Sequence, residues 1–295
     1  MRLVWGVGVL CALTLATGCG GSSKESVSLA TVEKAAFTTE GVGTARVSFK
    51  GSVTFNHDHA QRYEFKGHGV TDWGTDSSKM TAVYRFPDAV QEFVKARFGR
   101  APSADLILDG HDGLVLYMRF PFLKRVMPPG KSWLKADIVE MGKAYGLDLD
   151  RMKETKQSDP GLMLAYLKSA VGVRRVGSDL VQRDVTTHYS TIVKAETIVE
   201  QAPRDQQKAM TKFLRLMGIK TYPVDIWVDR DGVVRRLAMV LEYKLPDGEY
   251  VKMSVSEEYY DFGVEADIQA PPPRRVIDVT PRLRADRHNP RRHLS

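Results

Sequence analysis

The chain has 295 residues, an ordinary globular composition, two cysteines and a formal net charge of +7. That length suffices for one large domain or two small ones. The charge does not indicate a nucleic-acid-binding face, because residues 271–295 hold seven arginines against two aspartates and the rest of the chain is nearly neutral.

Residues 1–18 have the charge order of a secretory signal peptide. Arg2 precedes an uncharged, mostly apolar run over residues 3–17, which is shorter than a membrane-spanning helix of about 20 apolar residues. The run ends in small residues followed by Cys19, an order that resembles the bacterial lipobox, in which the cysteine is acylated and becomes the first residue. We therefore expect lipidation of Cys19, with acyl chains such as palmitate, and a place at the outer face of the cell membrane. An uncleaved N-terminal anchor helix is the alternative.

The segment that follows is expected to be a tether. Residues 19–28 are rich in glycine and serine, a composition typical of flexible linkers. Cys11 lies inside the signal peptide, so the mature chain would keep one cysteine and could form no internal disulfide. We expect a single folded domain over residues 29–262, stabilised by its core alone.

Alternation of apolar and polar residues is the dominant pattern from residue 43 onward. Val47, Phe49 and Val53 share one face of the first such segment, and charged or hydroxyl side chains occupy the other. A period of two residues predicts strands with one apolar face, and close spacing along the chain favours an antiparallel meander. The predicted strands cover residues 43–55, 61–70, 79–86, 113–120, 131–138 and 183–193, a hairpin over 221–245 that turns at 229–232, and 249–260.

Helical spacing is confined to three segments. Residues 28–37, 158–172 and 202–218 carry apolar side chains at helical intervals, whereas residues 86–106 read as a mixed segment. With roughly nine or ten strands and three or four helices, we predict an α+β fold with one long antiparallel sheet. Because several strands are long and strands twist, we expect a curled sheet, a half-open barrel with helices covering its concave apolar face.

The end of the chain differs in composition. Residues 263–295 are rich in proline and arginine and poor in apolar side chains, so we predict a basic, disordered tail. The tail is either an electrostatic arm for anionic lipid or cell-wall polymer, or a solvated and dispensable end.

The concave face is the candidate functional surface. An apolar inner surface is either a filled core or a ligand pocket, and small-molecule pockets are concave and mostly apolar. Methionine suits variable alkyl ligands because its side chain is flexible. The residues expected to line the concave side are Phe49, Phe55, Tyr84, Leu116, Leu164, Leu167, Phe213, Met217 and Met239.

The patterns of catalytic and metal sites are weak or missing in the sequence. His57 and His59 fall in a predicted turn without a third ligand at a fixed offset. Residues 229–232 share part of a calcium loop but lack its remaining acids. Glu257 and Glu258 are adjacent on a predicted strand, so their side chains point to opposite faces and cannot work as a pair. No G-x-S-x-G or phosphate-binding glycine motif occurs, and we expect no enzyme activity, cofactor, metal or nucleic-acid partner.

Two stretches carry a resemblance to a known family: "VGSDLVQRDVTTHYSTIV" at 176–193 and "YPVDIWVDRDGVVRRLAMVL" at 222–241. With the lipobox, the tether and the meander, they resemble the actinobacterial LppX/LprA/LprF/LprG lipoproteins of the wider LolA/LolB-like group, over roughly residues 29–262. The resemblance implies a half-open antiparallel barrel closed by helices, with an apolar cavity for acyl chains. Residues 86–106 and the basic tail depart from the family pattern.

With this resemblance the pocket is favoured over a filled core, and two functions stay open. The first is a lipid-anchored carrier that binds or transports an acylated lipid, glycolipid or lipoglycan non-covalently, with a membrane transporter or envelope protein as partner. The second is an envelope sensor with a filled core that binds a protein partner. A hollow of roughly several hundred Å³ on the concave side would favour the first.

Overall fold

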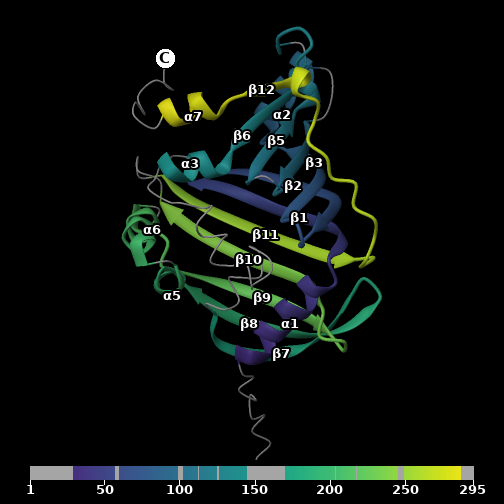
Figure 1. The fold of residues 1–295 in the computed structure, drawn as a ribbon, viewed down its shortest axis with the longest axis vertical. Coiled ribbons are helices and arrows are strands. Elements are labelled where there is room, and N and C mark those ends of the chain that lie inside the picture. The colour runs from purple at the N-terminus through teal and green to yellow at the C-terminus, as the bar shows by residue number, and fades with distance from the viewer. Residues whose placement is uncertain are drawn as a thin grey trace, which may run out of the picture.

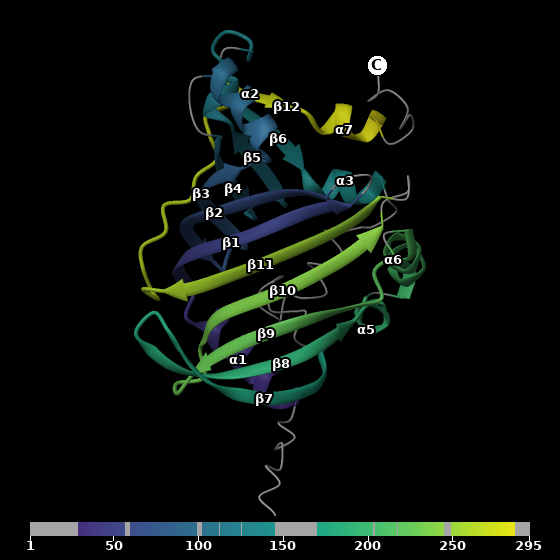
Figure 2. The same ribbon diagram turned by 180° about the vertical axis from the view of Figure 1, so that it is seen from behind.

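The computed structural model describes residues 29–56, 60–98, 102–111, 113–124, 126–144, 170–202, 204–216, 218–244 and 249–286. In these ranges twelve strands form one sheet, in the order β12-β6-β5-β4-β3-β2-β1-β11-β10-β9-β8-β7. Neighbouring strands are antiparallel, except that β12 runs parallel to β6. Figures 1 and 2 show the sheet from its two sides.

Two antiparallel meanders meet where β11 pairs with β1. The first contains β1 (Thr44–Asn56), β2 (Ala60–Asp72), β3 (Ser77–Arg85), β4 (Ser103–Asp109), β5 (Val115–Arg119) and β6 (Trp133–Asp137). The second contains β7 (Ala170–Val181), β8 (Asp184–Lys194), β9 (Thr221–Asp229), β10 (Val234–Lys244) and β11 (Tyr250–Tyr260). The short strand β12 (Val276–Asp278) extends the sheet beyond β6.

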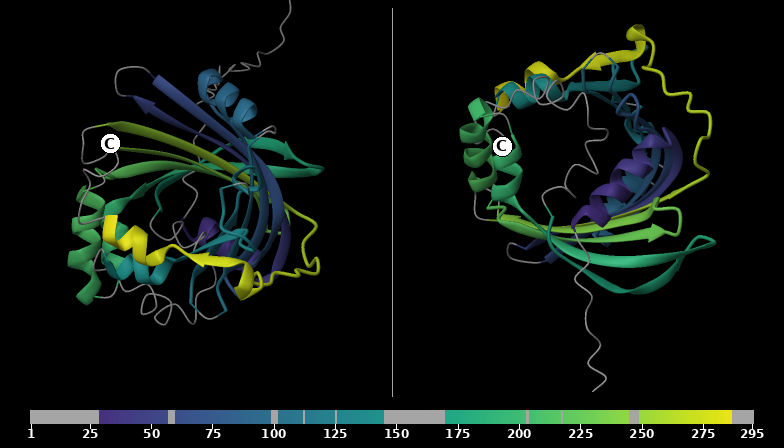
Figure 3. Two further views of the ribbon diagram at one scale, coloured as in Figure 1. Left: turned by 90° about the horizontal axis from the view of Figure 1, so that it is seen from above. Right: turned by 60° about the horizontal axis from the view of Figure 1, so that its bottom comes forward.

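The helices lie at the ends of the strands and inside the curve of the sheet. They are α1 (Leu29–Gly41), α2 (Asp88–Phe98), α3 (Ile138–Ala144), α5 (Ala195–Gln201), α6 (Arg204–Leu216) and α7 (Thr280–Asp286), with short 3₁₀ turns at Pro121–Leu123 and Pro273–Arg275. α1 packs on β7 and β10, α5 on α6, and α3 on α7. The right panel of Figure 3 shows α1 within the curve of the sheet. None of the helices in the described part of the chain combines the length and apolar content needed to cross a bilayer.

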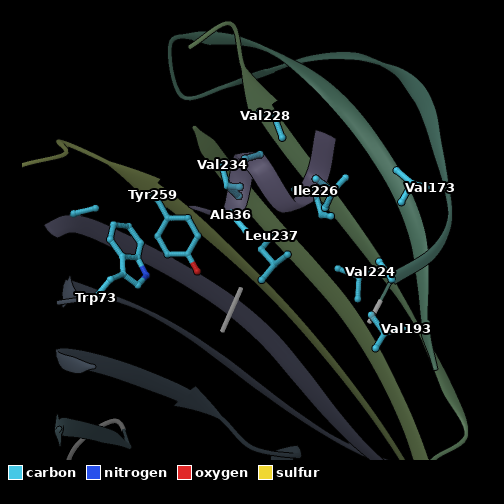
Figure 4. Close-up of a cluster of buried hydrophobic side chains, with 14 of the residues drawn as sticks. Ala36, Trp73, Val173, Val193, Val224, Ile226, Val228, Val234, Leu237 and Tyr259 are labelled. Atoms are coloured by element: carbon cyan, nitrogen blue, oxygen red, sulfur yellow. The ribbon is translucent and has the colours of Figure 1, made fainter. Parts of the chain in front are cut away.

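The packed core lies between α1 and the concave face of the sheet. Val32, Ala35 and Ala36 of α1 belong to one buried cluster with residues of β1 and of β7 to β11. Figure 4 shows Ile226 and Leu237 of this cluster beside α1. A hydrogen bond from the Val234 backbone N–H to Thr39 Oγ1 (2.8 Å) ties the end of α1 to the start of β10.

The predicted fold class is confirmed: one long antiparallel sheet curls around a helix in an α+β arrangement. Three strands were missed. The β7 segment shows almost no alternation because this edge strand carries two bulges and is exposed along most of its length. The expected helix over 158–172 is wrong at its end, since residues 170–172 belong to β7, and its other residues lie outside the described ranges.

The segment over residues 86–106 forms α2 and the start of β4, where no element was assigned. α2 is weakly amphipathic, since Val94 is buried while Val90 and Phe93 remain exposed, so its pattern gives little signal. The hairpin over 221–245 is confirmed as β9 and β10, and Asp229 closes its turn by accepting hydrogen bonds from the backbone N–H groups of Asp231 and Val233.

The expectation of disorder for residues 263–295 is wrong for part of that range. β12 pairs with β6, and the Asp137 backbone N–H donates to Thr280 Oγ1 at the start of α7 (2.9 Å). Arg284 of α7 forms an ion pair with Glu140 of α3 (3.1 Å). Low apolar content argued against burial, but a free sheet edge supplies backbone hydrogen bonds that need no apolar side chain.

Candidate functional site

Strand register decides which side chains share the concave face. Phe49 lies opposite Gly67 of β2 and Glu257 of β11, and Phe65 of β2 lies opposite Tyr84 of β3. The same alternation continues through β4, β5 and β6 on one side and through β10 on the other. On β1 to β6, β10 and β11, the apolar side chains on this face that keep partial exposure are Phe49, Val53, Phe55, Tyr63, Phe65, Met80, Tyr84, Leu106, Leu108, Leu116, Met118, Leu134, Met239, Leu241, Tyr243, Met253 and Val255.

The concave face therefore has two parts. Beneath α1 the residues are buried and belong to the packed core, among them Val47, Leu237 and Tyr259. Further along β1, β10 and β11, and across β2 to β6, most of the large inward side chains are apolar and only half-buried, whereas the small Ala82, Ala104 and Ala136 are buried. We call this second part the inner lining, meaning the seventeen partly exposed residues given above.

Aromatic rings shape the lining where the first meander bends. The ring of Phe65 lies over Gly51, and the ring of Phe49 lies over Gly67, in space that a Cβ atom would occupy. Phe49 and Phe65 are neighbours with ring centroids 6.3 Å apart. Such pairing of an aromatic ring with a glycine on the adjacent strand covers the exposed backbone and lets a sheet bend.

A second aromatic group continues the lining along β1, β2 and the end of β3. Phe55 and Tyr63 meet edge to face, with ring centroids 5.6 Å apart and planes at 89°. Tyr63 also contacts Phe86 at 5.9 Å, and Phe86 stacks on Tyr84 at 6.3 Å. Edge-to-face and offset pairs are favoured geometries for aromatic rings, so the cluster holds its shape without being fully covered.

Five of the nine residues predicted to line the concave side lie on it. Phe49, Phe55, Tyr84, Leu116 and Met239 occupy inner-face positions by register, although their role as ligand contacts stays a prediction. Four other predicted positions fall outside what the structure describes: Leu164, Leu167, Met217 and the lipidation site Cys19. Phe213 lies in α6, and its side chain is outside the described atoms.

Sequence reasoning left several inner-face residues out of its list. Tyr63, Phe65, Met118 and Met253 were recognisable from alternation alone, because each lies on the apolar side of a segment with a two-residue period. Glu257 gave no such signal, because a carboxyl group on an apolar face breaks the pattern that identifies the face.

Glu257 is an ionisable residue on the concave face, beside the inner lining. The Tyr259 hydroxyl donates a hydrogen bond to Glu257 Oε2 (2.6 Å). Burial raises the pKa of the Glu257 carboxyl, and the Tyr259 hydrogen bond offsets part of that rise. Burial, together with the neighbouring carboxyl, raises the pKa of Tyr259 well above its ordinary value. Glu258 faces the other side and pairs with Arg236 (2.7 Å), so the predicted separation of the two glutamates is confirmed.

The outer face carries a polar network around His188. Its Nε2 is 2.9 Å from Asp225 Oδ1, and its ring stacks on Trp227 with centroids 4.2 Å apart. Trp227 Nε1 donates to Asp179 Oδ2 (2.7 Å), and the Arg236 guanidinium lies over the Trp227 ring. These carboxylate, imidazole, indole and guanidinium contacts link β7, β8, β9 and β10. They therefore help to hold the edge strand β7 against the rest of the sheet.

Two grooves open among outer-face side chains, and each also borders residues of the inner lining. One of about 590 Å³ and one of about 420 Å³ share Lys50, Lys66, Val83 and Ser256, whose side chains are on the outer face by register. Another of about 530 Å³ lies between α5, α6 and the strand ends beside them. In the parts of the chain that the structure describes, no three histidine, cysteine or carboxylate side chains come together as a metal site would require.

No family model matches the chain. A curated relative from Streptomyces griseus, described as an uncharacterized 31.2 kDa protein in the rplA-rplJ intergenic region, is 29% identical over 164 residues, which cover 52% of this chain and 50% of that protein. The chain thus spans about half the length of the curated relative that it matches.

Solved structures resemble the chain at low sequence identity. Lipoprotein LppX of Mycobacterium tuberculosis is 10% identical with a TM-score of 0.43, covering 82% of this chain and 97% of that one. LprF from Mycobacterium bovis is 13% identical with a TM-score of 0.40, covering 82% and 96%. The LolA superfamily protein NE2245 from Nitrosomonas europaea is 9% identical with a TM-score of 0.28, covering 79% and 93%. LppX and LprF are both named in the group that the sequence resembles.

Proposed function

We propose that this protein binds the acyl chains of a lipid or glycolipid along its inner lining, without any covalent step. The observation that carries the proposal is the half-buried state of the lining, which extends over strands β1 to β6, β10 and β11. Large apolar areas that keep contact with water are unusual on soluble proteins and mark surfaces where something binds.

The composition of the lining fits a flexible, apolar ligand. Met80, Met118, Met239 and Met253 are distributed over β3, β5, β10 and β11. Methionine side chains adapt to ligands of variable shape, and aromatic rings offer large contact areas. Each methylene group that moves from water into such a lining contributes about 0.8 kcal/mol, so one acyl chain of ordinary length supplies enough free energy for stable binding.

The proposal includes attachment to the membrane through Cys19. Cleavage before Cys19 and acylation of its thiol would hold the folded domain beside the outer face of the membrane, with residues 19–28 as a tether. A carrier anchored in that position would reach a membrane lipid without the lipid having to cross the aqueous phase. Release of the ligand would then require a partner at the membrane or movement of the helices that stand around the curve of the sheet.

Lipid analysis of the natively expressed protein tests the proposal. Protein purified from its own host should carry acylated lipid, detected by native mass spectrometry. Protein stripped of lipid should take up a fluorescent fatty-acyl probe. Consistently empty protein that takes up no probe would contradict the proposed function, and a co-purifying protein without lipid would support the sensor alternative.

A matched pair of substitutions ties binding to the inner lining. Val255 and Val240 are valines on the adjacent strands β11 and β10, with Val255 on the concave face and Val240 on the outer face. Val255→Trp should weaken probe binding about tenfold, because displacing two methylene groups from contact costs about 1.6 kcal/mol. Val240→Trp, as the control, should leave the dissociation constant within about twofold. Equal effects of the two substitutions would place binding elsewhere.

A further inference from the structure

One ionisable carboxyl interrupts an otherwise uncharged surface. At the inner-face positions of β1 to β6, of β9 and β11, and of β10 from Leu237 onward, Glu257 is the only aspartate, glutamate, lysine, arginine or histidine that the structure describes. A carboxyl group in apolar surroundings is costly unless it finds hydrogen-bond partners. Its presence therefore calls for a physical reason.

Glu257 lies where the packed core gives way to the inner lining. Its neighbours across the two adjacent strands are Phe49 of β1, which belongs to the lining, and Leu237 of β10, which belongs to the core. Along its own strand it lies between Val255 of the lining and the buried Tyr259. The side chain is surrounded by protein, yet part of its surface remains accessible. A ligand chain lying along the lining would thus end at this carboxyl.

The contact with Tyr259 leaves hydrogen-bonding capacity unused. The tyrosine hydroxyl occupies Oε2, while Oε1 accepts no hydrogen bond from the residues that the structure describes. Tyr259 is held in place by an edge-to-face contact with Trp73 at 5.5 Å. A protonated carboxyl can donate one hydrogen bond and accept others, so Glu257 offers both functions to a ligand.

The surrounding charges select the kind of group that fits. A phosphate near Glu257 would meet a group that carries negative charge when ionised. The described inner-face positions of β1 to β6, β9 and β11, and of β10 from Leu237 onward, hold no lysine or arginine to neutralise it. A hydroxyl or an ester carbonyl carries no charge, so it is not repelled by an ionised Glu257 and needs no cation to neutralise it. Both exchange hydrogen bonds with a carboxyl group without adding charge to an apolar site.

From these observations we propose that Glu257, positioned by Tyr259, hydrogen-bonds an uncharged hydroxyl or ester group of the bound lipid at the end of the inner lining. The substrate class is then an acylglycerol or acylated sugar with its neutral polar group next to β11, and not a lipid that places phosphate there. This inference rests on the proposed function, because it assigns the polar contact of the same binding surface.

Two lipid probes with the same acyl chain test the inference on the whole chain. Monooleoylglycerol and oleoyl lysophosphatidic acid share the chain and differ in the phosphate, and an alkene of equal length reports binding of the chain alone. The wild type should bind monooleoylglycerol about tenfold more tightly than the lysophosphatidic acid. Glu257→Leu should lower the affinity for monooleoylglycerol about five- to tenfold and leave alkene binding unchanged.

Variants of the same pair of strands provide the controls. Glu257→Gln keeps a donor and an acceptor and should stay within about threefold of the wild type for monooleoylglycerol. Glu258→Gln changes the neighbouring outer-face residue and should change no affinity. Wild-type protein that binds none of the probes would overturn the proposed function itself. Binding of all probes with no difference between wild type and Glu257→Leu would overturn this inference and leave the proposed function intact.

Discussion

Replacing Gly67 by alanine should destabilise the protein through the inner lining. A Cβ atom at this position would meet the ring of Phe49 on β1 and the carbonyl oxygen of Thr81 on β3 at less than van der Waals separation. The phenyl ring can move, but the Thr81 carbonyl is part of the sheet backbone. The substitution therefore forces either a displaced ring or a shift of β2 against β3.

The expected cost follows from the two contacts. Extra atoms forced into a well-packed position cost about 1–3 kcal/mol. Alanine in place of glycine also restricts the unfolded chain, which returns about 0.4–1 kcal/mol where the new residue fits. The clash is the larger effect, so we expect a net loss of about 1–2 kcal/mol in the free energy of unfolding.

Urea denaturation followed by tryptophan fluorescence measures this loss. Gly177→Ala is the matched control, because Gly177 also lies in a strand, has no atom within 4 Å of the point where a Cβ would lie and has no unusual backbone angle. The control should be neutral or slightly more stable than the wild type. Equal stability of the Gly67→Ala and Gly177→Ala proteins would refute the close approach of the Phe49 ring and with it the described shape of the lining.

Four further outcomes follow from the sequence and the structure. Burial raises the pKa of Glu257 above its value in the unfolded chain, so its contribution to stability is complete below the unfolded pKa and is lost as the pH rises through the folded pKa. In urea titrations, Glu257→Gln should therefore gain stability relative to the wild type as the pH rises from below the unfolded pKa to above the folded pKa of Glu257. A stability difference that does not change with pH would contradict the burial of this carboxyl. His188→Ala, which loses the Asp225 hydrogen bond and the Trp227 stack, should lower the free energy of unfolding by about 1–3 kcal/mol without changing acyl-probe affinity. Truncation before residue 276 removes β12 and α7, so we expect a lower Tm and faster aggregation in light scattering from the uncovered edge of β6. Cys19→Ala should release the protein from the membrane fraction on cell fractionation, and continued attachment would favour the uncleaved anchor.

Much of the fold could be predicted from the sequence because alternation is a local property. The segments around Val47, Tyr63 and Leu241 indicate their inward faces within a few residues, and the structure places those faces on one concave surface. Segments without a clean period were missed. β7 is mostly exposed, and β12 forms only because the edge of β6 is available to it.

The candidate site was only partly predictable for a related reason. Five of its residues were identified as apolar members of alternating strands, whereas Glu257 was dismissed as half of an unsuitable carboxylate pair. The role of Glu257 depends on its neighbours Phe49 and Leu237. Phe49 belongs to β1, which precedes β11 by some 200 residues in the chain, so this proximity cannot be read from the local sequence.

The sequence by itself therefore determined which side is apolar in the strands with a clean two-residue period, and it predicted an exported, lipid-modified N-terminus. The tertiary structure alone decided which strands are neighbours, where α1 fills the concave face and where a lining of half-buried side chains remains. The physical reason is that periodicity is encoded between residues two apart, whereas strand order and register arise from pairing across the whole chain. A single carboxyl at the boundary between core and lining becomes visible only after that pairing is complete.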